Sequence, residues 1–134
     1  MAVVLRRMLA GREFRVYTFG HDDDCPLFDF LERLERDDES EHAKFWALIQ
    51  RIAEHGAPRN EQKCRFIPEL DGFELKTTGG VRVFAFYDRN RVVICSHGFL
   101  KKSQKTPKAQ LVRAVSIRAE YVKAAALGEV TVEE

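Results

Sequence analysis

The sequence RVVICSHGFLKKSQKTPK, residues 91–108, decides the fold because it contains the passage from a buried strand to a helix. Its first six residues are largely apolar and β-branched, which is typical of a strand inside a sheet. Beyond residue 108, apolar residues recur at helical spacing as far as Lys123. Thr106 and Pro107 favour a helix start, since a hydroxyl can cap free backbone amides and proline fits the first turn. The segment therefore predicts a strand, an ordered junction and a helix.

The elements upstream of this segment complete an α+β pattern. Polar and apolar residues alternate over 12–19, which predicts a half-exposed strand and the first strand of the sheet. Pro26 starts a helix, a second helix covers 39–55, and turn residues at hairpin spacing separate three further strands. Those strands are expected at 73–76, 81–87 and 91–97, and a helix at 108–123. We expect a small antiparallel β-sheet meander with two N-terminal helices and a C-terminal helix packed on it.

Length and composition indicate one domain. The chain has 134 residues, 45% of them hydrophobic, which suits a single domain over 1–134 with residues 124–134 as a loose tail. No apolar run approaches the roughly 20 residues of a membrane helix, and the N-terminus lacks a signal-peptide core. We therefore expect a cytoplasmic protein without membrane contact.

Three cysteines bear on the class of site. Cys25, Cys64 and Cys95 are widely spaced, without a Cys-x-x-Cys pair or a histidine at ligand spacing. The pattern favours buried, reduced thiols over a disulfide framework or a zinc site. We expect no metal and no cofactor.

The net charge of +1 hides a strongly polarised chain. Residues 22–41 are densely acidic, whereas residues 101–123 are densely basic. A polyanion would approach the basic region and avoid the acidic one. The alternative is that both regions are solvated helix faces that offset one another.

The basic region also belongs to a recognisable pattern. A strand, His97-Gly-Phe, Lys101-Lys102, then Gln-Lys-Thr-Pro and a helix follow one another. This order resembles toxins of the RelE/ParE superfamily, in the HigB-like, phage-derived branch of type II toxin–antitoxin systems. The resemblance extends back through LDGFELK, residues 70–76, and GVRVF, residues 80–84, and covers roughly the C-terminal half.

The resemblance implies an activity and its partners. Toxins of this kind cleave messenger RNA without a metal, commonly on the ribosome, by promoting attack of the ribose 2′-hydroxyl on the adjacent phosphate. The implied partners are messenger RNA, the ribosome and a cognate antitoxin of helix-turn-helix type. Two alternatives stay open: a gyrase-inhibiting toxin of the ParE branch, and an inactive module that binds nucleic acid or an antitoxin.

The resemblance also assigns catalytic roles. Arg82 and Lys102 would stabilise the pentacoordinate phosphate, and Lys76, Lys101 or His97 would transfer protons. Lysine can act as a base only if neighbouring cations lower its pKa.

Three further basic residues of the region, Lys105, Lys108 and Arg113, would bind RNA.

Plainer interpretations stand beside these roles. Arg82, in an apolar strand, could pair with Glu74 on the neighbouring strand. His97 could be a structural hydrogen-bonding residue, and Lys76 an exposed lysine at a strand end. Tyr121 is interpreted as a packing residue of the last helix, so the proton donor is the least defined role.

Overall fold

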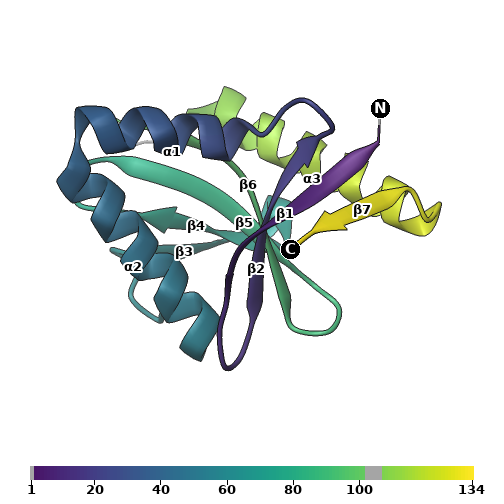
Figure 1. Cartoon of the computed structure of the whole chain (residues 1–134). Helices are drawn as coiled ribbons and strands as arrows, with labels where there is room; N and C mark the ends of the chain where they lie inside the picture. The colour runs from purple at the N-terminus through teal and green to yellow at the C-terminus, as the bar shows by residue number, and fades with distance from the viewer. Residues whose placement is uncertain (1, 102–106) are drawn as a thin grey trace.

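The structure is a computed structural model that describes residues 2–101 and 107–134. At its centre lies a mixed sheet of seven strands (Figure 1). The strands lie in the order β3-β4-β5-β6-β2-β1-β7. The elements, in chain order, are β1 (Val3–Ala10), β2 (Arg15–His21), α1 (Pro26–Asp37), α2 (Glu39–His55), β3 (Cys64–Ile67), the short 3-10 helix η1 (Pro68–Leu70), β4 (Gly72–Lys76), β5 (Val81–Asp88), β6 (Val92–Leu100), α3 (Lys108–Ala126) and β7 (Val130–Glu133).

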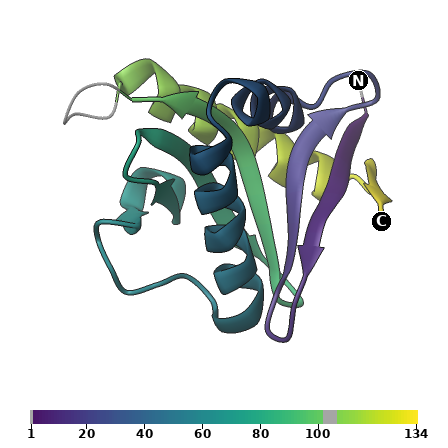
Figure 2. The same ribbon diagram turned by 60° about the vertical axis from the view of Figure 1, so that its left-hand side comes forward.

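Helices cover both faces of the sheet: α1 and α2 lie on one side and α3 on the other (Figure 2). This follows from the sequence of β5, which is apolar at successive positions and so buries both of its faces. Val83 and Ala85 pack in one core cluster with Phe45 of α2. Phe84 and Phe86 point the opposite way and pack in a second cluster with residues of α3. The core therefore has two halves separated by the sheet.

The three predicted helices are confirmed, and local signals explain their ends. Pro26 occupies the first turn of α1. The side chain of Asp38 caps α2 by accepting a hydrogen bond from the amide of Glu41 at 3.2 Å. Gly56, with a φ of 83°, ends α2, because glycine adopts this backbone conformation without strain.

The predicted antiparallel meander is present as β4, β5 and β6, but it is part of a larger sheet of seven strands that also has parallel pairs. β2 runs parallel to β6, and β1 runs parallel to β7. Parallel strands need long crossover connections, and here the chain passes through α1, α2 and three strands between β2 and β6. The prediction also missed β1 and β3. Two arginines interrupt the apolar residues of β1, and β3 has only four residues.

The expectation that 124–134 forms a loose tail is also wrong. Helix α3 continues to Ala126, and Val130–Glu133 forms strand β7 on the edge of the sheet, paired with β1. Glu133 forms an ion pair with Arg6 at 3.3 Å, and the hydroxyl of Tyr17 donates to the Glu134 carboxylate at 3.0 Å. The pairing partner, β1, was itself not predicted, so β7 could not be predicted as its neighbour in the sheet.

The three cysteines are free thiols, as predicted: Cys64 and Cys95 are buried and Cys25 is half-buried. Burial raises the pKa of Cys95 to about 12. Burial also raises the pKa of Cys64, to about 11, although the charge of Lys76 lowers it slightly. Both thiols therefore stay protonated and unreactive at neutral pH. In the described part of the chain, no helix is both long enough and apolar enough to cross a membrane.

Candidate nucleic-acid interface

Two of the predicted site residues, Lys76 and Arg82, lie directly opposite each other on β4 and β5. Residues paired across two strands project on the same face of the sheet, so the two cations are neighbours. Arg65 on β3 and Glu74 on β4 form the adjacent pair and share that face. This is the face that α3 covers farther along β5. The structure therefore places a charged area on the sheet beside the end of the α3 core.

The guanidinium of Arg82 is half-buried and held by backbone carbonyl groups. Its Nη1 donates to the carbonyl oxygens of Thr77 and Val81, at 3.1 and 2.9 Å. Its buried Nε has no hydrogen-bond partner among the described residues. A buried donor without an acceptor is unfavourable for the folded state.

Glu74 makes its ion pair with Arg65 and not with Arg82, the partner considered from the sequence. The carboxylate is 1% exposed, and Arg65 Nη2 lies 3.4 Å from Glu74 Oε1. Arg65 was missed because β3, the strand that carries it, was not predicted. The negative charge of this buried carboxylate attracts the surrounding cations and offsets part of their mutual repulsion.

Lys101 completes this group, which we call the cation cluster: Arg65, Lys76, Arg82 and Lys101. Its backbone amide donates to the carbonyl oxygen of Gly80 at 2.7 Å, which holds the end of β6 against the β4–β5 turn. Burial lowers the pKa of Lys101; Glu74 raises it, and the other three cations of the cluster lower it further. The net direction is downward, so Lys101 loses its proton more readily than an isolated lysine.

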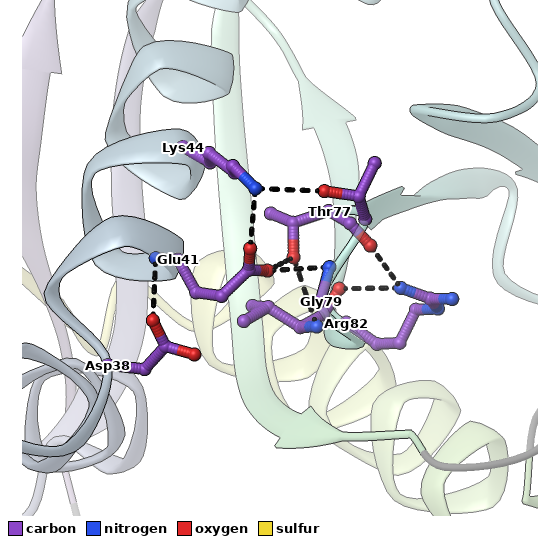
Figure 3. A network of polar contacts seen from close by, with 8 residues as sticks. Asp38, Glu41, Lys44, Thr77, Gly79 and Arg82 are labelled. Carbon is purple, nitrogen blue, oxygen red and sulfur yellow. Dashed lines mark hydrogen bonds and ion pairs between the residues drawn. The ribbon is translucent and has the colours of Figure 1, made fainter.

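The turn between β4 and β5 is held from the other side of the sheet by Glu41 of α2, as Figure 3 shows. Glu41 is 4% exposed. Its carboxylate accepts hydrogen bonds from the hydroxyl of Thr77, from the amide of Gly79 at 2.8 Å and from Lys44 Nζ at 3.0 Å. Because Thr77 also accepts a hydrogen bond from Arg82, Glu41 is linked to the cation cluster through a single residue.

Burial alone would raise the pKa of Glu41, but the hydrogen bonds from Thr77, Lys44 and Gly79 outweigh it and lower that pKa. A Cβ atom at Gly79 would overlap the carboxyl group of Glu41, so a side chain there would displace this carboxylate from its hydrogen bonds. Sequence analysis missed this role because Glu41 lies in an acidic run that resembles solvated helix surface. The available signal was Gly79 itself, in a turn with two hydroxyl residues.

His97, on β6, is 1% exposed, and its ring stacks on that of Phe99 with 6.0 Å between the ring centroids. Its Nε2 lies 2.8 Å from Oε1 of Gln110 on α3, and its Nδ1 lies 3.2 Å from the hydroxyl of Ser96. Burial lowers the pKa of His97 to about 4. The hydrogen bond with Gln110 raises this pKa by a smaller amount, and the charge of Arg113 lowers it further. The ring is therefore neutral at neutral pH and joins β6 to α3, as the structural interpretation of the sequence had it.

The remaining predicted residues are only partly placed. Lys108 and Arg113 are exposed on the N-terminal half of α3. Lys102, Lys105 and the helix-start residue Thr106 lie outside the described residues. The structure thus brings Lys76, Arg82 and Lys101 together and adds Arg65 to them.

No group of three or more histidine, cysteine, aspartate or glutamate side chains is arranged to hold a metal ion within residues 2–101 and 107–134.

Tyr121 packs on Phe86 and donates a hydrogen bond to Asp88, at the end of β5 away from the cation cluster. Its position agrees with the packing role inferred from sequence.

Comparison with known families adds one match. The model of the family described as phage-derived protein Gp49-like (DUF891) matches residues 29–118, more than half of the chain. The matched range runs from α1 into α3 and includes Glu41 and the whole cation cluster. No curated protein matches the chain.

Proposed function

The chain belongs to the phage-derived Gp49-like family, and from this membership we propose that it is the toxin of a type II toxin–antitoxin system that cleaves messenger RNA. The proposal places it in the HigB-like branch of the RelE/ParE superfamily, as its sequence motifs suggest. One observation carries it: Lys76, Arg82 and Lys101, chosen from sequence as site residues, gather in one cation cluster.

The reaction would begin with removal of a proton from a ribose 2′-hydroxyl. Lys101 suits this step, because burial and the neighbouring cations lower its pKa and make the neutral amine accessible. The 2′ oxygen then bonds to the adjacent phosphorus, and the bond from phosphorus to the 5′ oxygen breaks. The products are a 2′,3′-cyclic phosphate and a 5′-hydroxyl end.

Arg82 would bind the phosphate as its negative charge grows. Its guanidinium is half-buried and is fixed by the carbonyl oxygens of Thr77 and Val81, so its remaining donors would need no rearrangement when the charge develops. Lys76, directly opposite, would donate a proton to the leaving 5′ oxygen, and Lys102 would add positive charge. His97 is assigned a positioning role, because its buried ring cannot reach a substrate.

Lys105, Lys108 and Arg113 would hold the RNA on either side of the reacting phosphate through contacts with its backbone. The proposed partners are messenger RNA, the ribosome and an antitoxin that covers the cation cluster. The proposed location is the cytoplasm, where the substrate is translated.

The proposal is tested by induced expression in a bacterial host. Wild type, Lys101→Ala and the control Lys123→Ala would be compared, since Lys123 is an exposed lysine in the last turn of α3. We expect growth arrest and new transcript 5′ ends from wild type and control, and neither from Lys101→Ala at equal protein level. Arrest without new transcript ends would instead indicate gyrase as the target, and absence of arrest would indicate a binding module.

A further inference from the structure

A pocket of about 340 Å³ lies next to the cation cluster, on the side of α2. Figure 2 shows the segment between α2 and β3 swinging away from the helix before it returns to the sheet. The pocket lies between α2, residues 62–63 of that segment and residues 76–78 at the end of β4. Lys76 belongs to its wall, so the pocket and the cation cluster share one residue.

Four basic residues line the pocket: Lys44 and Arg51 of α2, Lys63, and Lys76, which projects its side chain on the face of the sheet shared with Arg82. Among the described residues that line it, none carries a carboxylate. Lys44 is paired with Glu41 at 3.0 Å, whereas the other three form no ion pair within the described part of the chain. Arg51 and Lys63 therefore bring positive charge to the pocket without a counter-charge among the described residues, so the pocket is electrostatically suited to an anion.

The rest of the lining is suited to a flat ring. Ala47 and Leu48 give the α2 wall an apolar surface. Gln62 and Thr78 add an amide and a hydroxyl that can form hydrogen bonds with the edge of a base. The volume lies at the lower end of the range of about 300–1,000 Å³ found for small-molecule pockets, which fits one nucleotide.

We propose that this pocket is a nucleotide subsite that takes an RNA nucleotide next to the cleaved bond. Arg51 and Lys63 would bind its phosphate, and the base would lie against Leu48. The inference rests on the proposed function, because Lys76 connects the pocket to Arg82. It adds a second contact surface, on the opposite side of the sheet from α3, to the basic residues named from sequence.

The test is calorimetric titration of the full chain with the four nucleoside 3′-monophosphates, with the four nucleosides and with inorganic phosphate. Arg51→Ala and Lys63→Ala remove exposed side chains, so the fold should be unaffected; Lys123→Ala is the control for charge. We expect saturable nucleotide binding by wild type and control, weakened about tenfold in each pocket variant by loss of a charge-assisted contact.

The outcomes separate the pocket from the reaction. No saturable nucleotide binding, or binding equal in wild type and both pocket variants, overturns the subsite. Two further results overturn the subsite. Nucleosides, which lack the anion, could bind as tightly as nucleotides. Inorganic phosphate, which lacks the base, could also bind as tightly as nucleotides. Binding that depends on Arg51 and Lys63 in a chain that cleaves no RNA would leave the nucleotide site standing while the proposed function fails.

Discussion

The carboxylate of Glu41, on α2, accepts a hydrogen bond from the amide of Gly79, in the turn that joins β4 to β5. This contact joins helix α2 to the β4–β5 hairpin. It holds the turn beside which Lys76 and Arg82 lie opposite each other. The turn residue Thr77 donates to Glu41 through its hydroxyl and accepts from Arg82 through its carbonyl oxygen (Figure 3). A buried acid on one side of the sheet therefore positions a cation on the other.

Replacing Glu41 with glutamine should lower the free energy of unfolding by about 2 kcal/mol, because hydrogen bonds to a charged group are lost. The matched control is Glu39→Gln, an exposed acid in the same helical turn, which should change stability by less than about 0.5 kcal/mol. Urea unfolding at pH 7 measures both. Equal stability of the two variants would show that Glu41 does not hold the turn.

The stabilisation by Glu41 should depend on pH. Because the folded pKa of Glu41 is below its ordinary value of 4.5, the contribution is complete above that value. It is lost as pH falls through the folded pKa. Unfolding curves from pH 7 to pH 3 should therefore bring wild type and Glu41→Gln together at the acid end. A constant difference over that range would contradict the assignment.

Arg65→Gln should shift the pH profile of RNA cleavage toward higher pH. Arg65 helps to lower the pKa of Lys101, so its removal raises that pKa and leaves less neutral amine at a given pH. The rising limb of the cleavage rate against pH is the measurement. Arg89→Gln, an exposed arginine at the other end of β5, should leave the limb in place. An unmoved limb in Arg65→Gln would remove Lys101 as the base.

His97 should affect acid stability and not catalysis. Its folded pKa of about 4 lies below the ordinary 6.5, so the unfolded state binds the proton more readily as pH falls. Wild type should lose up to roughly 3 kcal/mol between pH 7 and pH 4 from this residue, since one pKa unit is about 1.4 kcal/mol. His97→Asn should lack that component and still cleave RNA. Equal acid sensitivity of the two proteins, or inactivity of folded His97→Asn, would contradict this role.

Removing residues 128–134 should destabilise the domain and promote association. The deletion takes away β7 with the Arg6–Glu133 ion pair, and it exposes the edge of β1 to pairing with other chains. Melting temperature and size-exclusion chromatography at several concentrations measure the two effects. Glu129→Ala, an exposed change in the same segment, is the control. An unchanged melting temperature and a monomeric profile would show that β7 adds nothing to the fold.

The sequence was sufficient to predict elements whose signals are local. The second helix has a cap at Asp38 and a stop at Gly56, and the strands of the meander are joined by short turns. It was insufficient for β1 and β7, because their pairing brings the two ends of the chain together and no residue between them indicates it. The parallel pairing of β2 with β6 could not be predicted either, because α1, α2 and three strands separate them along the chain.

Part of the candidate site was likewise predictable from the sequence, and part of it was not. Lys76 and Arg82 were predicted as neighbours because a tight turn joins their strands, and the register confirms that pairing. Glu41 and Arg65 were missed, since each meets the site through contacts that only the folded chain creates. A buried acid in an acidic run has no sequence signal of its own.

The most direct test of the cation cluster is cleavage of a translated messenger by purified protein in a cell-free translation reaction. Wild type, Arg82→Ala and the charge-matched Lys123→Ala would be compared by mapping transcript ends and their chemistry. We expect new 5′-hydroxyl ends from wild type and Lys123→Ala, and a loss of at least about 100-fold in Arg82→Ala, which is the effect of removing one donor to a developing charge. Equal cleavage by folded Arg82→Ala, or no cleavage by wild type, would contradict it.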